Sequence, residues 1–168
     1  MNRVAEALFY QENDDGLFIR ALGHITAAVS TDLREVILER LSQTPVPQLL
    51  AVDLSACEYM DSTFMGLLVG FHKRYRQLTG RSLTILRPTQ ECTKLLTSLG
   101  ILRILTLVSG PQPPSPSTWT GLRASQAPST EVLLNAHRNL SELSPENKKK
   151  FSALQNVLEQ QLNEKDPG

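Results

Sequence analysis

The sequence has no excess of charge of either sign. Seventeen Lys and Arg residues balance seventeen Asp and Glu residues in the 168-residue chain. The balance also holds regionally: residues 1–108 carry 11 charges of each sign, and residues 130–168 carry five basic and six acidic residues. Nucleic-acid binding depends on clustered basic side chains, and binding to a membrane surface on polybasic runs. We therefore expect neither nucleic acid nor a membrane as a partner.

Long hydrophobic runs are also lacking. Residues 1–6 have no apolar core of the kind that marks a signal peptide, and no stretch approaches the length of a membrane span. Apolar residues nevertheless make up 40% of the chain, which is enough for a hydrophobic core. The length indicates one domain, or one domain with an appendage. The chain is predicted to be cytoplasmic.

Groups that carry out catalysis or hold metals are scarce. Cys57 and Cys92 are the only cysteines, and their spacing matches no metal motif, so both are interpreted as small buried or half-buried side chains. His24, His72 and His137 lie far apart in the sequence, which argues against a metal centre. There is no Gly-x-Ser-x-Gly turn and no glycine-rich phosphate loop. We therefore expect no enzymatic activity, no metal and no cofactor.

Predicted strands and helices alternate over the first 108 residues. A turn sequence at residues 13–16 predicts that the first two strands form a hairpin. Beyond it, the alternation at this pitch indicates β-α-β units with right-handed crossovers, and therefore an α/β domain over residues 1–108. The strands are expected at residues 6–12, 17–25, 49–54, 82–86 and 104–108, and the helices begin near residues 30, 63 and 89.

Polar residues mark the expected helix starts and solvent-facing helix surfaces. Hydroxyl and carboxyl groups in residues 30–32 are candidate N-caps for the first helix. In the second helix, residues 63–79, apolar side chains recur on one face, and Gly80 is expected to end the helix. His72 and its basic neighbours Lys73 and Arg74 are expected on the solvated face.

The composition changes after residue 108. Residues 109–129 are rich in proline and serine, which is typical of a linker. Two amphipathic helices are predicted in residues 130–164, with residues 129–130 and 144–145 as their starts. A helical pair this short does not bury its apolar stripe alone. It is expected to pack on the main domain or on another chain, which makes a homodimer through these helices possible.

The end of the third strand and the start of the second helix form the candidate site. A short apolar run ends at Asp53, a polar loop is expected to follow, and Asp61, Ser62 and Thr63 open the helix. Ser62 is expected to direct its hydroxyl into solvent. Such a serine can cap the helix, accept a phosphoryl group, or do both. A phosphate at this position would lie at a helix N-terminus, where free amides and the helix dipole favour an anion.

The segment from Val52 to Leu68 resembles the signature of the STAS domain family, to which bacterial anti-sigma factor antagonists belong. That signature is an apolar strand, Asp-Leu-Ser, a short loop with an aromatic residue, and Asp-Ser-Ser/Thr-Gly at a helix start. The resemblance extends over roughly residues 4–108 and includes Gly23 and the segment 95–101. It implies an α/β fold with a mixed sheet flanked by helices. The predicted C-terminal helical hairpin is an extension that matches nothing in the minimal family domain.

The resemblance implies protein binding that is switched by phosphorylation. The unphosphorylated domain would capture an anti-sigma factor, usually an ATP-dependent serine kinase, and so free a sigma factor for transcription. Ser62 is the implied phosphoacceptor, with Thr63 less favoured, and a PP2C-type phosphatase would restore the active form. The expected partner-binding residues are Asp53, Asp61, Ser62, Thr63, Phe64 and Met65.

Two residues depart from the family pattern. Phe64 replaces the usual glycine, and its ring either packs inward or reshapes the partner surface. Thr26 stands where the family often has an aspartate.

Three other functions stay open at this point. One is a STAS scaffold that oligomerises through its C-terminal helices, with Ser62 acting only as a cap. A small serine hydrolase would need a base that the neighbouring sequence does not supply. A regulatory domain of a transporter is disfavoured, because the chain has no predicted membrane span.

Overall fold

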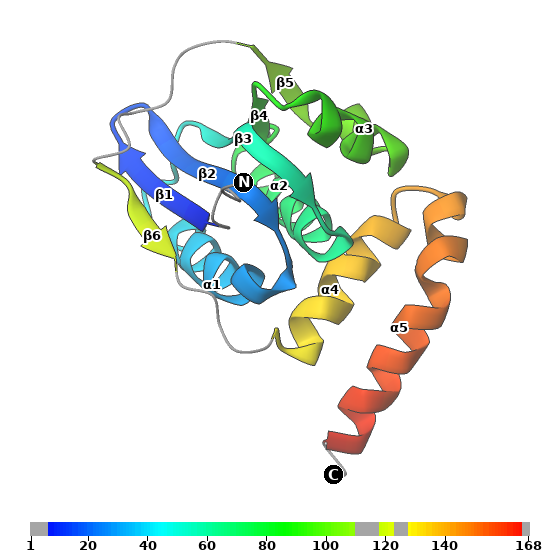
Figure 1. Cartoon of the computed structure of the whole chain (residues 1–168). Coiled ribbons are helices and arrows are strands. Elements are labelled where there is room, and N and C mark those ends of the chain that lie inside the picture. Colours follow the sequence, from blue (N-terminus) through cyan, green and yellow to red (C-terminus); the bar gives the residue numbers. More distant parts are fainter. Residues whose placement is uncertain (1–6, 110–117, 123–127, 166–168) are drawn as a thin grey trace.

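The structure is a computed structural model that describes residues 7–109, 118–122 and 128–165 (Figure 1). One mixed sheet has the strand order β5-β4-β3-β2-β1-β6. β1 pairs antiparallel with β2 and β6, whereas β2, β3, β4 and β5 are parallel. This arrangement confirms the predicted α/β fold. The strands are β1 (Ala7–Asn13), β2 (Gly16–Ile25), β3 (Leu50–Met60), β4 (Thr84–Leu86), β5 (Thr106–Val108) and β6 (Thr120–Leu122).

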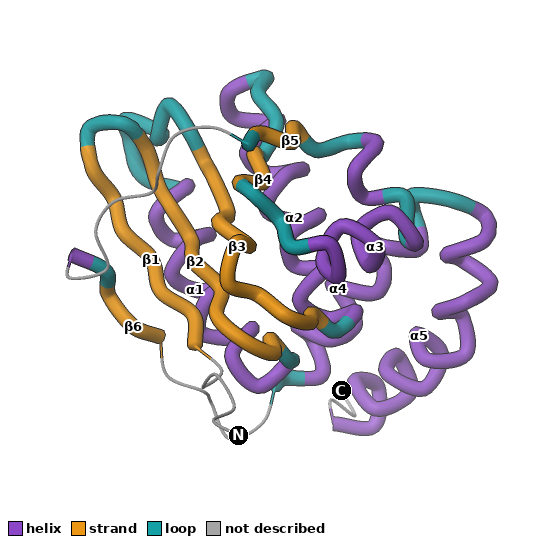
Figure 2. Tube along the Cα trace, turned by 45° about the horizontal axis from the view of Figure 1, so that its top comes forward, coloured by secondary structure: helices purple, strands orange, loops and turns teal. Residues whose placement is uncertain are grey.

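Three helices cover one face of this sheet, and two more form the C-terminal hairpin (Figures 1 and 2). The predicted hairpin of two helices is therefore confirmed. Short 3₁₀ turns at Ala27–Val29 and Ile101–Arg103 precede α1 and β5. The helices are α1 (Ser30–Leu41), α2 (Ser62–Thr79), α3 (Gln90–Ser98), α4 (Thr130–Ser141) and α5 (Pro145–Lys165).

The β1–β2 hairpin closes on an asparagine side chain. The Asn13 Oδ1 atom accepts hydrogen bonds from the amides of Asp15 and Gly16, at 2.8 and 3.2 Å. Gly16 also passes close to the start of β3, since a Cβ there would lie 2.5 Å from the Leu49 carbonyl oxygen. The predicted turn is thus confirmed, and close backbone packing gives its glycine a second role.

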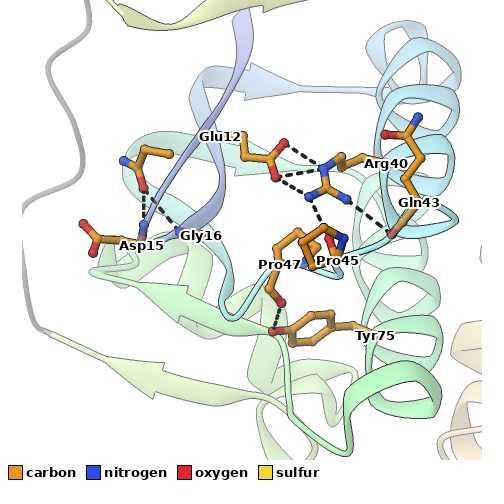
Figure 3. Close-up of polar contacts among 9 residues, drawn as sticks. Glu12, Asp15, Gly16, Arg40, Gln43, Pro45, Pro47 and Tyr75 are labelled. Carbon is orange, nitrogen blue, oxygen red and sulfur yellow. Dashed lines mark hydrogen bonds and ion pairs between the residues drawn. The ribbon is translucent and has the colours of Figure 1, made fainter.

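Polar contacts hold the connection between α1 and β3 (Figure 3). The Arg40 side chain, near the end of α1, donates to Glu12 at 2.7 Å and to the Pro45 carbonyl at 2.9 Å. The bond to Glu12 raises the pKa of the Arg40 guanidinium. From α2, the Tyr75 hydroxyl donates to the Pro47 carbonyl at 2.8 Å. These bonds fix the path of the chain into β3, and β3 leads to the candidate site.

The main hydrophobic core lies between the sheet and helices α1, α2 and α3, and extends to Leu140 of α4 and Phe151 of α5. Leu50, Val52 and Leu54 of β3 point into it. Ala51 belongs to a second, smaller cluster with Phe18 and Leu86, so alternate residues of β3 face opposite sides of the sheet.

The predicted N-cap of α1 is wrong. Val29 occupies the cap position, and no side chain caps the helix there. The 3₁₀ turn Ala27–Val29 runs directly into α1, so backbone carbonyls accept from the amides of Val29 and Ser30. The Ser30 hydroxyl instead donates to the Thr26 carbonyl at 3.3 Å.

β3 is longer than predicted. The polar loop expected after residue 54 is wrong, because the strand continues to Met60 and pairs with the full length of β2. Two register shifts, between Arg20 and Leu22 and between Gly23 and His24, let the longer pairing continue. The strand therefore ends at Met60, directly before the start of α2.

His72 is buried rather than on a solvated helix face. Its side chain lies between α2 and β4, and its Nδ1 atom accepts a hydrogen bond from the Leu83 amide at 3.2 Å. Burial lowers the pKa of the His72 imidazole, and the positive charges of Arg76 and Lys73 act in the same direction. The prediction failed because α2 is buried around most of its circumference near this residue.

β6 lies within the segment that was expected to be only a linker. It adds to the free edge of β1, with Leu8 opposite Leu122 and Tyr10 opposite Thr120. At three residues, this strand gives no periodic signal in the sequence. The division of the chain at residues 108 and 129 stays a prediction.

The C-terminal hairpin packs on the chain's own domain. α4 lies against α2, and α5 lies against α4 (Figures 1 and 2). The predicted starts are confirmed, since Ser129 and Ser144 accept from the amides of Val132 and Asn147 at 3.1 and 3.0 Å. Asn147 is buried and anchors the turn of the hairpin. Its side-chain amide donates to the Leu99 carbonyl on the domain and the Leu140 carbonyl on α4, both at 2.9 Å.

Candidate functional site

Asp61 fixes the start of α2. Its Oδ1 atom accepts from the Phe64 amide at 2.9 Å and caps the helix. Its Oδ2 atom accepts from the Ala27 amide at 2.7 Å, which ties the start of α2 to the segment after β2. The Asp61 amide itself donates to the Ile25 carbonyl at 3.0 Å. Asp61 therefore performs the capping role that the sequence left open for Ser62.

The Ser62 hydroxyl contacts a histidine of the C-terminal hairpin. Its Oγ atom lies 2.9 Å from Nε2 of His137 on α4, so the expectation of a solvent-facing hydroxyl is wrong. The His137 Nδ1 atom lies 2.7 Å from the Leu133 carbonyl oxygen, which accepts only. Nδ1 therefore carries a hydrogen, and in the tautomer without a hydrogen on Nε2 this atom accepts from the Ser62 hydroxyl.

His137 is enclosed by the hairpin. Its side chain is 2% exposed, and its ring lies 5.2 Å from the Phe151 ring of α5, measured between centroids. A serine bonded to a histidine has the chemistry of an activated nucleophile. In this structure His137 is buried, whereas Ser62 is only partly buried. The contact with His137 holds the Ser62 hydroxyl against α4.

Two glycines let α4 approach α2 closely. A Cβ on Gly66 would lie 2.2 Å from the Ala136 carbonyl oxygen, so backbone meets backbone at this crossing. A Cβ on Gly70 would meet only the end of the Asn139 side chain. That side chain also donates to the Gly66 carbonyl at 3.3 Å. α4 thus lies directly against the first turns of α2.

The other residues predicted near Ser62 are buried. Thr63 and Met65 are each 4% exposed, and Phe64 is fully buried in the main hydrophobic cluster. Of the two possibilities for Phe64, the inward packing is confirmed. The structure brings Asp61, Ser62, Thr63, Phe64 and Met65 together at the start of α2.

Asp53 is not part of this group. It points to the sheet face opposite the main core, is 1% exposed, and accepts from the Ser55 amide at 2.9 Å. The Arg20 and Arg87 guanidinium groups lie 3.9 and 3.6 Å from its Oδ2 atom. Its role as a partner contact stays a prediction.

The cysteines are buried, as predicted. Cys57 and Cys92 are both free thiols with no exposed surface, and the Cys92 thiol donates to the Cys57 carbonyl at 3.2 Å. The side-chain interaction between the two thiols, followed by burial, raises the pKa of the Cys57 thiol. Among the described residues there is no group of three His, Cys, Asp or Glu side chains placed to hold a metal ion. In the same part of the chain, no helix is long and apolar enough to cross a membrane.

Sequence reasoning missed His137. The residue was treated as an isolated histidine, because its partner Ser62 is distant in the chain. One signal was present: His137 falls on the helix face that also carries the buried residues Leu134 and Leu140. A polar side chain within an apolar stripe needs a polar partner when it is buried.

Asp61→Ala should lower the free energy of unfolding by about 2 kcal/mol. The cap is worth about 1 kcal/mol, and the bond from Ala27 contributes about as much. Asp61→Asn is the matched control, since one amide oxygen still caps the helix while the NH₂ group does not accept from Ala27. Urea denaturation should therefore place Asp61→Asn between the wild type and Asp61→Ala. Equal stability of all three proteins would contradict the assignment of the cap.

Comparison with known proteins places this chain in a family. No curated protein matches it. Among solved structures, the anti-sigma factor antagonist SpoIIAA in its unphosphorylated form matches with a TM-score of 0.49 and 15% sequence identity, over 61% of this chain and 88% of that chain. The sequence profile described as "STAS domain" matches residues 8–112, well over half of the chain. The chain therefore belongs to the STAS domain family.

Proposed function

We propose that this protein is a regulator of the anti-sigma factor antagonist type. In its unphosphorylated form it captures an anti-sigma factor of the serine-kinase type in the bacterial cytoplasm, and so regulates sigma-dependent transcription. Phosphorylation of Ser62 ends the capture, and a PP2C-type phosphatase restores it. In the phosphorylation step the Ser62 oxygen attacks the γ-phosphorus of ATP, the bond from that phosphorus to the β–γ bridging oxygen breaks so that ADP leaves, and the hydroxyl proton passes to a base of the kinase.

The observation that carries this proposal is the division of roles between Asp61 and Ser62. Because Asp61 caps α2, the Ser62 hydroxyl is not needed to start the helix. A phosphate there would lie at the helix N-terminus, a favourable place for an anion. It adds a charge of about −1.5 to −2 beside Asp61. Modification should therefore change the binding surface while the domain stays folded.

Phosphopeptide mapping of the full chain purified from its native cells tests the proposal. We expect a phosphate on Ser62 whose occupancy changes with growth condition, and none in a Ser62→Ala strain. Ser62→Asp should capture less of the cognate kinase than the wild type does, with an unchanged far-UV circular dichroism spectrum. A Ser62 that stays bare in every condition would contradict the switch.

A second candidate is a STAS scaffold whose copies associate through the C-terminal helices. The observation that favours it is on α5, where Leu154 and Val157 are 41% and 50% exposed. Apolar side chains this exposed are available to a second chain. A persistently bare Ser62 in the mapping experiment would favour this candidate over the switch.

A further inference from the structure

We propose that the α4–α5 hairpin is a displaceable cover that competes with the protein partner for one face of α2. The face consists of Ser62 and Gly66, together with the side chains that α4 buries around them. The inference rests on the proposed function for the identity of the partner. The existence of the cover and its release are physical properties of this chain and are tested separately below.

The cover is specific for Ser62. On α4, His137 contacts Ser62 at the start of α2, and its ring is oriented by the Leu133 carbonyl. The ring is buried between α4 and Phe151 of α5, so both helices of the hairpin contribute to the enclosure. A buried imidazole that lost Ser62 would leave Nε2 without a partner, which is costly. The hairpin therefore recognises an unmodified hydroxyl at this position.

The shape of the face indicates what kind of partner fits it. At the crossing, Gly66 meets the backbone of Ala136, so the occupant is a helix with a small residue at the contact. Beyond the crossing, Asn139 donates to the Gly66 carbonyl and Lys73 contacts Glu142. A partner that replaces α4 should present a helix with a small residue, flanked by a hydrogen-bonding side chain and a carboxylate.

Occupation of this face by α4 excludes modification of Ser62. A kinase active site must surround the acceptor oxygen, which here lies 2.9 Å from His137. A phosphoryl group would replace the hydrogen that Ser62 donates to Nε2. It would also insert three oxygens about one helical turn from Gly66, where the crossing leaves no room for a Cβ. The hairpin must therefore leave before phosphorylation, and it does not return in the same arrangement afterwards.

Two glycines on α2 offer a wedge variant and its matched control. In Gly66→Ala, the new Cβ collides with the backbone of Ala136, whereas in Gly70→Ala it meets only the flexible end of Asn139. Both changes add the same methyl group to the same helix. Gly66→Ala should release α4, and Gly70→Ala should leave it docked.

Accessibility at position 62 is measured with Ser62→Cys in the full chain, using N-ethylmaleimide as the probe and peptide mass as the readout. Adding Gly66→Ala should raise the labelling rate of Cys at position 62 by about tenfold to a hundredfold. Overpacking a close contact destabilises it by about this factor. Adding Gly70→Ala should change the rate less than about threefold. Cys57 and Cys92 are fully buried and act as internal controls, so they should stay unlabelled while the domain is folded.

Three results would overturn the cover. Equal labelling of all three proteins would show that α4 does not control access to position 62. Labelling of Cys57 and Cys92 in Gly66→Ala would show that the hairpin is an inseparable part of the core. Unchanged hydrogen exchange of residues 130–165 in Gly66→Ala would show that the hairpin is not released. Asn147→Asp changes the hairpin and leaves α2 intact, and it should also give faster labelling. This variant distinguishes release of the hairpin from a change that Gly66→Ala makes within α2 itself.

The role in signalling is tested with chains that keep Ser62. In native cells, Gly66→Ala should carry more phosphate on Ser62 than the wild type or Gly70→Ala does. Equal occupancy in the three chains would overturn the competition between hairpin and partner. If no chain carries phosphate, the proposed phosphorylation fails, while the labelling result still decides whether the cover exists.

Discussion

Phe64→Ala should lower the free energy of unfolding by about 3–5 kcal/mol. The ring lies in the first turn of α2, is fully buried, and belongs to the main cluster between the helices and the sheet. Its removal leaves a cavity that close-packed neighbours fill only in part. The quantity to measure is the free energy of unfolding from urea titration of the full chain.

Two control variants show whether this loss comes from the cavity. Phe64→Leu keeps most of the volume and should lose less than about 1.5 kcal/mol. Leu78→Ala removes an apolar side chain from the same helix at a position that is 37% exposed, and should lose about 0.5 kcal/mol or less. A loss below about 1 kcal/mol for Phe64→Ala would contradict inward packing of the ring, since cavities of this size cost more.

Asn147→Asp should weaken docking of the hairpin by about 3 kcal/mol or more. The amide of Asn147 donates to the carbonyls of Leu99 and Leu140, and an aspartate of nearly identical shape has no hydrogen to donate to either. The Leu99 carbonyl loses its bond from this side chain, at a cost of about 1–3 kcal/mol, whereas the Leu140 carbonyl still accepts from the Leu143 amide at 3.1 Å. A carboxylate pressed against two carbonyl oxygens adds repulsion and desolvation in the same direction.

Native-state hydrogen exchange of α4 and α5 measures this docking free energy. Asn156→Asp makes the same chemical change on the same helix at an exposed position, and should leave the exchange rates within about twofold of the wild type. Protection should fall in residues 130–165 of Asn147→Asp and stay high in β2 and β3. Loss of protection throughout the chain would mean that the hairpin and the domain unfold as one unit.

Local signals in the sequence predicted the main domain well. The turn at residues 13–16, the helix stop at Gly80 and the serine caps of α4 and α5 each depend on neighbours in the chain, and all are confirmed. The strand and helix alternation gave the parallel part of the sheet, because crossover connections have few alternatives.

Features that depend on distant partners were not predictable in this way. β3 extends to Met60 because β2 is long enough to pair with it, and β6 exists because the edge of β1 is free. The same holds for the site. Residues 61–65 were located from their own sequence, whereas the contact between Ser62 and His137 joins two segments that only the packing of α4 on α2 brings together.

The pairing of β6 with β1 keeps a released hairpin close to the face of α2 for which it competes. It fixes Thr120–Leu122 to the sheet edge, and α4 begins at Thr130, so the chain positions between the two are few. A short connection holds a released segment at an effective concentration in the millimolar range. The hairpin is therefore a competitor that does not dilute away when the cell makes more or less of the protein. A partner must outcompete it for the face, and while Ser62 is unmodified the face closes again as soon as that partner leaves.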